Sequence, residues 1–301
     1  MTAWWVRNRR FVIQSAGTLL AVFLLYLLFK EEGWDEILSA LHTISLVDLF
    51  LVAAFFAVSR VATAARWHVL LRSGGVTISF RDTLSLTITG LFASNFLPTT
   101  IGGDAVRLAG AMQMGFDRAV CLASLAADRL IGMFGMSMAA PLGLSYSWNT
   151  LFGGVSALSA STFFQRPFDF LKRTFSALSL WLKKPGSLLA SLAFTWVHML
   201  CLFASIAVFV RDLGSPVSFW MIAGLWSLTY FITLIPISIN GLGVQELSFT
   251  FFMSNVAGLS AHDSLTVAIL IRAYFLFSSL PGAALLPSTL ANMARQKEGP
   301  Q

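Results

Sequence analysis

The sequence predicts an all-α fold, a polytopic transmembrane bundle of about eight spans with re-entrant or broken segments and an internal repeat. Of the 301 residues, 56% are hydrophobic and only 11% are charged, whereas soluble domains usually carry about 25% charged residues. Apolar runs of about 20 residues, long enough to cross a bilayer, recur along the chain. Two further apolar segments are interrupted by proline and glycine. We therefore expect a single membrane domain over residues 1–301.

The expected spans follow in order along the chain. Phe11–Phe29 comes after a basic amino terminus and lacks a small-x-small cleavage site, so we interpret it as an uncleaved first span. The other runs with the length of a span are Ser45–Leu71, Ala119–Leu142, Trp148–Phe164, Ser187–Val210, Val217–Ile235, Asn240–Ala257 and Ser264–Leu286. Residues 168–184 alternate Phe, Leu and Trp with Lys and Arg, which is typical of an amphipathic helix at the membrane surface.

The stretch from Thr83 to Met114 is apolar but interrupted between Asn95 and Asp104, and neither piece is a full-length span. Irregular backbone at membrane depth is tolerated only where protein or a water-filled cavity satisfies its polar groups. We therefore expect a re-entrant hairpin here. The other interrupted segment, Asn240–Ala257, we count as a crossing.

Positive charge lies in short clusters between the apolar runs. The clusters are Arg7, Arg9 and Arg10; Arg66 and Arg72; Arg166, Lys172, Arg173, Lys183 and Lys184; and Arg295 with Lys297. Cytoplasmic loops of membrane proteins carry such an excess of Lys and Arg, so we expect both termini on the cytoplasmic side of the inner membrane. The same distribution argues against nucleic acid as a partner, despite the net charge of +6. We expect Arg60 and Arg66 to snorkel to the cytoplasmic interface.

The two interrupted segments resemble each other. Pro98 corresponds to Pro236, isoleucine, glycine and valine match at later positions, and a helix that carries an arginine follows each segment. Matched Gly/Pro-interrupted segments in two halves of a chain indicate the binding site of a transporter, although so short a match also arises by chance. The predicted halves are residues 45–145 and 187–290, in parallel or inverted orientation.

Polar residues within these apolar segments predict the functional site, because an ionisable side chain there costs about 2.5–3.5 kcal/mol on insertion scales. The expected substrate-binding residues are Asn95, Asp104, Arg107, Asp128, Arg129, Asn240, Glu246 and Arg272. The expected backbone or hinge positions are Pro98, Gly102, Gly103, Pro236, Gly241 and Gly243. Guanidinium groups match phosphate oxygens, and N–H groups at glycine-rich helix starts favour the same anion. The alternative is an ion-pair network that only stabilises the bundle.

Asp128 and Arg129 are adjacent, so on a helix they point about 100° apart and each is expected to find a partner on another helix. The four histidines are scattered and the two cysteines lie in apolar runs. We therefore expect no metal and no cofactor.

Several of these residues also carry a resemblance to a known family. The run Asn95-x-x-Pro98-x-x-x-Gly102-Gly103-Asp104-x-x-Arg107, then Asp128-Arg129, then Pro236-x-x-x-Asn240-Gly241-x-Gly243-x-x-Glu246, together with Arg66-Trp67, resembles the lysylphosphatidylglycerol synthase transmembrane family. The resemblance covers nearly the whole chain. It departs from the family at Asp128, where Glu is usual, and at Asn240, where Gly is usual.

The resemblance implies a flippase-like domain, similar to the lipid-translocating portion of the bacterial multiple peptide resistance factor. The soluble aminoacyl-transferase domain of full-length synthases has no counterpart in the 301 residues, so the family name does not imply that activity here. Because no G-x-x-x-x-G-K-[ST] loop is present, we expect transport that is not driven by ATP, with Glu246 or Asp128 as a proton carrier.

We expect a lipid translocase rather than an enzyme, which moves an anionic, phosphate-bearing or polyprenyl-linked lipid between leaflets. One alternative is an integral-membrane enzyme that modifies lipid head groups. Another is an accessory subunit of a cell-envelope glycosyltransferase. The expected partners are membrane lipids, with a glycosyltransferase or a lipid-synthesis enzyme as a protein partner.

Overall fold

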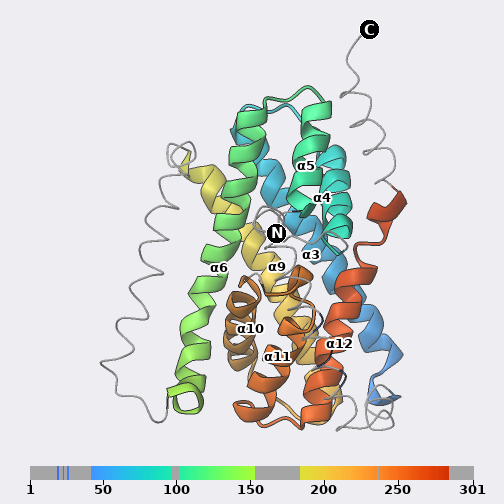
Figure 1. Ribbon diagram of the computed structural model, residues 1–301, viewed down its shortest axis with the longest axis vertical. Helices are drawn as coiled ribbons and strands as arrows, with labels where there is room; N and C mark the ends of the chain where they lie inside the picture. The colour runs from blue at the N-terminus through green and yellow to red at the C-terminus, as the bar shows by residue number, and fades with distance from the viewer. Residues whose placement is uncertain are drawn as a thin grey trace, which may run out of the picture.

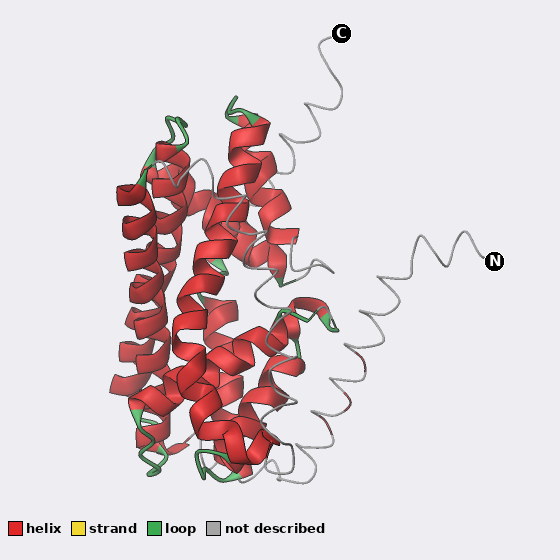
Figure 2. Cartoon of the chain, turned by 90° about the vertical axis from the view of Figure 1, so that its left-hand side faces the viewer, coloured by secondary structure: helices red, strands yellow, loops and turns green. Residues whose placement is uncertain are grey.

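The computed structural model describes residues 42–95, 102–152, 184–235 and 237–284, together with Leu19, Phe23 and Tyr26. Within these ranges all regular structure is helical (Figure 2), which confirms the predicted fold class. Several sequence-based expectations fall outside the described residues. They are most of the span Phe11–Phe29, the end of Trp148–Phe164, the surface helix over 168–183, and the hinge positions Pro98 and Pro236.

The described helices form two sets with the same order of lengths. The first set is α3 (Leu46–Ser73), α4 (Phe80–Ser94), α5 (Gly102–Gln113) and α6 (Arg118–Phe152). The second set is α9 (Pro185–Asp212), α10 (Phe219–Thr233), α11 (Val244–Asn255) and α12 (Ala261–Phe277), with a short 3-10 helix η1 (Ile239–Gly241) between α10 and α11. Each set opens with helices of 28, 15 and 12 residues. This correspondence extends the predicted internal repeat beyond the short motif match.

Three of these helices begin at a Ser-x-x-Asp sequence. The hydroxyls of Ser45, Ser79 and Ser260 each accept a hydrogen bond, at 3.1 Å, from the backbone N–H of the aspartate three residues later. A serine in this position satisfies one of the N–H groups that the first helical turn leaves unpaired, and the aspartate favours the positive end of the helix dipole. The starts of α3, α4 and α12 are therefore set by local sequence.

Among the described helices, four are long and apolar enough to cross a membrane. They are Leu46–Ser73, Arg118–Leu151, Pro185–Asp212 and Ala261–Ala284. One predicted boundary is wrong, because α6 continues without a break through residues 142–148, where the sequence analysis placed a loop between two spans.

The helices at the crossings predicted over 217–235 and 240–257 are shorter than the sequence suggested. With 15 and 12 residues, α10 and α11 are about 22 and 18 Å long, which is short of the roughly 30 Å of a bilayer core. Instead α10 packs against α11, as α4 packs against α5. The chain therefore has two short helical hairpins where the sequence predicted one.

The two sets of helices run in opposite directions (Figure 1). At one end of the bundle Arg211, late in α9, pairs with Asp48, early in α3, at 2.9 Å. At the other end Lys184, before α9, donates to the carbonyl of Ser73, at the end of α3. In Figure 1 the α4–α5 hairpin occupies the upper half and the α10–α11 hairpin the lower half. The halves are therefore inverted, an orientation that the sequence left open.

The largest apolar core among the described residues joins the second set of helices to α3 and α6. Its fully buried side chains include Phe203, Phe209, Leu225, Met253 and Ile271. Large apolar side chains also cover much of the outer surface, for example at the start of α3. An apolar exterior around an apolar core suits a bundle that is surrounded by lipid.

Candidate functional site

A cavity of about 370 Å³ lies where the two hairpins meet, and side chains from both sets of helices line it. Seven of the eight expected substrate-binding residues are among its lining, all except Glu246. Five arginines reach it, namely Arg60, Arg66, Arg107, Arg129 and Arg272. Buried guanidinium groups require partners, so the contacts of each define what the cavity can do.

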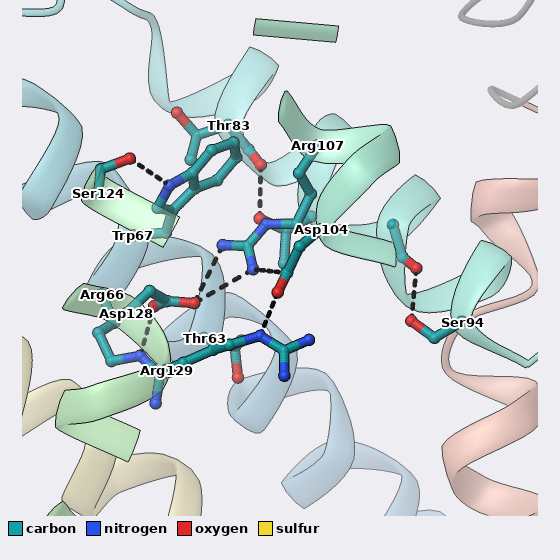
Figure 3. Close-up of polar contacts among 12 residues, drawn as sticks. Thr63, Arg66, Trp67, Thr83, Ser94, Asp104, Arg107, Ser124, Asp128 and Arg129 are labelled. Atoms are coloured by element: carbon teal, nitrogen blue, oxygen red, sulfur yellow. Dashed lines mark hydrogen bonds and ion pairs between the residues drawn. The ribbon is translucent and has the colours of Figure 1, made fainter. Parts of the chain in front are cut away.

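In the first half, five charged residues form one network across α3, α5 and α6 (Figure 3). Asp128 accepts from Arg66 Nε at 2.6 Å with one oxygen, and from Arg107 Nη1 and Nη2 at 3.1 and 3.2 Å with the other. Arg107 Nη1 also donates to Asp104 Oδ1 at 3.1 Å, and Arg129 Nε pairs with Asp104 Oδ2. Asp128 and Arg129 thus find partners on other helices, as predicted.

Arg107 is enclosed by side chains of α3 and by the backbone of α4. Its guanidinium carbon lies 4.1 Å from the centre of the Trp67 ring, and Trp67 donates from Nε1 to Ser124 Oγ at 3.0 Å. Only 7% of Arg107 is exposed. The stem of Arg107 lies against Gly90, and a Cβ on Gly103 would stand 2.3 Å from the Gly90 carbonyl oxygen. The glycines therefore let α4 and α5 approach closely enough to enclose Arg107.

In the second half, Arg272 stabilises the turn before α11. Its Nε pairs with Glu246 Oε1, while Nη1 and Nη2 donate to the carbonyls of Asn240 and Gly241 at 3.3 and 3.2 Å. The other carboxylate oxygen of Glu246 accepts from the Gly243 N–H at 2.7 Å. Asn240, Gly241 and Gly243 all have positive φ, a conformation that glycine adopts without strain and that asparagine tolerates.

The ion pairs of the two halves occupy equivalent positions. Asp104 is the third residue of α5 and Glu246 the third of α11, while Arg129 and Arg272 are the twelfth residues of α6 and α12. In both pairs the arginine Nε contacts the carboxylate. Arg129 is the more accessible of the two, with 40% of its side chain exposed against 21% for Arg272.

The two hairpin tips touch. Asn240 Nδ2 donates to Asn95 Oδ1 at 3.1 Å, and Asn95 Nδ2 donates to Ser279 Oγ at 3.0 Å. The two interrupted segments therefore meet at one cavity, through Asn95 and Asn240. None of the expected backbone glycines, Gly102, Gly103, Gly241 and Gly243, is among the residues that line the cavity.

The prediction that Arg60 and Arg66 snorkel to the interface is wrong, because only 7% and 9% of these residues are exposed. Arg66 pairs with Asp128. Arg60 donates from Nε to Ser278 Oγ at 2.9 Å and from Nη2 to the Phe275 carbonyl at 3.4 Å. Arg60 is the fifteenth of the 28 residues of α3. Its position in the middle of the span is the sequence feature that indicates a buried side chain rather than one at the interface.

His198 is a further cavity residue that sequence reasoning missed. Its Nδ1 lies 2.6 Å from Ser59 Oγ, and the ring lines the cavity. Within the part of the chain that the structure describes, no group of three or more His, Cys, Asp and Glu side chains is placed to hold a metal ion.

Comparison with known proteins identifies the family. No curated protein matches the chain. The family model described as "Lysylphosphatidylglycerol synthase TM region" matches residues 14–282, which includes both sets of helices and every charged residue of the cavity. The protein therefore belongs to the lysylphosphatidylglycerol synthase transmembrane-region family, as its motifs predict.

Proposed function

We propose that the protein is a lipid translocase, which moves a phosphate-bearing lipid between leaflets with the head group in the cavity and the chains in the bilayer. Membership of the family connects the protein with membrane lipids. The observation that carries the proposal is an arginine-rich cavity, built from both inverted halves at the point where their hairpins meet.

The charge of the cavity favours an anionic ligand. Among the described residues, five arginines line the cavity, and three carboxylates, Asp104, Asp128 and Glu246, pair with them, which leaves an excess of two positive charges. A planar guanidinium matches the oxygens of a phosphate, and such charge-assisted hydrogen bonds are among the stronger ones in proteins. Arg129 is the arginine we expect to contact the phosphate first, because its side chain is the more accessible of the matched pair.

The inverted hairpins support movement between leaflets. We propose that each hairpin is re-entrant and closes the cavity from its own side of the membrane. Transporters built from inverted repeats expose a central site to one side and then to the other by moving one part against the other. The helix directions and the contact between Asn95 and Asn240 fit such an arrangement.

The distribution of charge at the two ends supports an orientation. Among the described residues, the end from which α4–α5 enters carries four basic residues, Arg72, Arg81, Arg118 and Lys184, beside Asp82 and Asp117. The other end carries one basic residue, Arg211, beside Asp48, Asp212 and Asp263. The positive-inside rule places the α4–α5 hairpin on the cytoplasmic side. We propose an inner-membrane protein with both termini in the cytoplasm, and transport that is downhill or coupled to an ion gradient.

Reconstitution tests the proposal. Proteoliposomes that contain fluorescent phosphatidylglycerol, phosphatidic acid or a prenyl phosphate would be treated with a membrane-impermeant quencher, and the lipids extracted afterwards for mass spectrometry. Lipids in the inner leaflet are protected from the quencher, so translocation appears as a loss of their fluorescence. The proposal expects this loss, dependent on the protein, for at least one phosphate lipid, with its head group chemically unchanged. An altered head group would favour a lipid-modifying enzyme, and no movement of any phosphate lipid would contradict the proposal.

A further inference from the structure

Arg60 is the one cavity arginine, among the residues that the structure describes, that has no carboxylate partner. Its two hydrogen-bond acceptors, the Ser278 hydroxyl and the Phe275 carbonyl, are neutral. Its guanidinium carbon lies 5.2 Å and 5.9 Å from the ring centres of Phe275 and Phe56. Arg60 is 7% exposed, and it lines the cavity. A buried cation without an anionic partner is costly, so the site at Arg60 favours the binding of an anion.

The remaining cavity charges divide into two groups. Arg272 and Glu246 compensate each other. The network of Arg66, Arg107 and Arg129 faces two aspartates, which leaves one positive charge in excess. The two uncompensated charges of the cavity therefore lie in different places, one at the network and one at Arg60.

The two places face different helices. Arg60 and Arg66 both lie on α3, but Arg60 donates to Ser278, just after α12, whereas Arg66 donates to Asp128 on α6. Both residues border the same cavity. A single phosphate group contacts one of these places at a time, whereas a ligand with two linked phosphate groups offers one group to each.

We propose that Arg60 is a second phosphate-binding residue and that the substrates are lipids with a diphosphate head group. One phosphate binds at Arg129 on the network, and the other binds at Arg60. This inference rests on the proposed function, since it requires that the cavity binds lipid head groups. It narrows the substrate from any phosphate-bearing lipid to those with two adjacent phosphates.

The test compares two probes that differ by one phosphate, farnesyl monophosphate and farnesyl diphosphate, so that the contribution of the apolar chain cancels. Their dissociation constants would be measured by calorimetric titration of the purified full chain in detergent. We expect the wild type to bind the diphosphate more tightly. Arg60→Met keeps an apolar side chain against Phe56 and Phe275 but removes the cation, so it is expected to weaken diphosphate binding by about 10- to 150-fold and monophosphate binding much less.

Arg72→Gln is the matched control, because Arg72 lies on the same helix but is exposed and outside the cavity. It is expected to leave both affinities unchanged. If Arg60→Met does not fold, Arg60→Lys replaces it, since this variant keeps the charge but loses the planar donor pair, and the preference for the diphosphate is expected to fall.

Three results would overturn the inference while the proposed function stands. They are equal affinity of the wild type for the two probes, an unchanged preference in the folded Arg60 variant, and an equal loss of affinity for both probes in that variant. Failure of the wild type to bind either probe would contradict the proposed function as well.

Discussion

The side-chain amide of Asn240 donates a hydrogen bond of 3.1 Å to the side-chain carbonyl of Asn95, a residue 145 positions earlier in the chain. Asn95 follows α4 and Asn240 lies between α10 and α11, so this bond joins the tips of two hairpins that approach from opposite ends of the bundle (Figure 1). The cavity with its five arginines opens beside it. In the proposed function, this contact lies where the translocation path opens and closes.

Linking the two hairpin tips is expected to stop transport, because alternating access requires them to move relative to each other. Asn95→Cys and Asn240→Cys would be combined in a background where the free cysteines Cys121 and Cys201 are alanine, and joined by a short bifunctional thiol reagent. Lipid translocation is then measured in proteoliposomes before and after cleavage of the linker. The single-cysteine variants, treated alike, are the controls. Full translocation by the linked protein would exclude movement of the tips.

Asp128→Asn is expected to destabilise the bundle. Asp128 is 2% exposed and pairs with Arg66 and Arg107, and removal of one partner from a buried ion pair costs about 3–5 kcal/mol. The melting temperature of the variant, measured in detergent, should be much lower than that of the wild type. Asp48→Asn, which breaks the pair with the largely exposed Arg211, should lower the melting temperature far less, because water and salt screen an exposed ion pair. Equal melting temperatures for the two variants would contradict the network as a stabilising element.

Arg272 and Glu246 should be energetically coupled. Each single change, Arg272→Gln or Glu246→Gln, leaves a charge unpaired near the turn that Arg272 stabilises through the carbonyls of Asn240 and Gly241. The double variant leaves no such charge, so it should be more stable than the sum of the single effects predicts, by about 0.5–3 kcal/mol. Chemical unfolding of the four proteins measures this coupling. If the effects of the two single changes simply add, the interaction between Arg272 and Glu246 contributes nothing to the free energy of unfolding.

Gly103→Ala tests the close packing of α4 against α5. The new methyl group would stand 2.2 Å from Ser94 Oγ and 2.3 Å from the Gly90 carbonyl oxygen, so the two helices must separate, at a cost of about 1–3 kcal/mol. Gly186→Ala is the matched control, because it also lies in a helix and nothing stands within 4 Å of its added Cβ. That variant is expected to be neutral or slightly stabilised. A Gly103→Ala protein as stable as the control would contradict the packing.

Much of this architecture follows from the sequence. Apolar runs predict the long helices, and the matched interruptions near Asn95 and Asn240 predict the meeting point of the halves. The second hairpin was missed because α10 is apolar throughout, and composition alone does not distinguish a short helix packed in protein from a span. The relative direction of the halves was also out of reach, since it depends on how many times the residues between them cross the membrane.

The sequence predicted most of the residues that form the candidate site, but not which of them form ion pairs with each other. Asp104, Arg107 and Asp128 were expected near one another, whereas Arg66 was assigned to the membrane interface. Its partner Asp128 lies 62 residues away on another helix, and only tertiary packing brings the two together. Tertiary packing also gives different exposure to arginines that could not be distinguished in the sequence. Arg107 is enclosed by Trp67, whereas Arg129 remains accessible.

The central claim is that the cavity translocates a lipid through a phosphate contact at Arg129, and one paired measurement on Arg129→Gln tests it most directly. Head-group translocation in proteoliposomes and thermal melting in detergent would be recorded for the variant and the wild type. The account predicts near-normal melting, because the side chain is partly exposed, with translocation reduced by about 10- to 150-fold, the worth of one charge-assisted phosphate contact. A well-folded Arg129→Gln protein that moves phosphate lipids at the wild-type rate would contradict it.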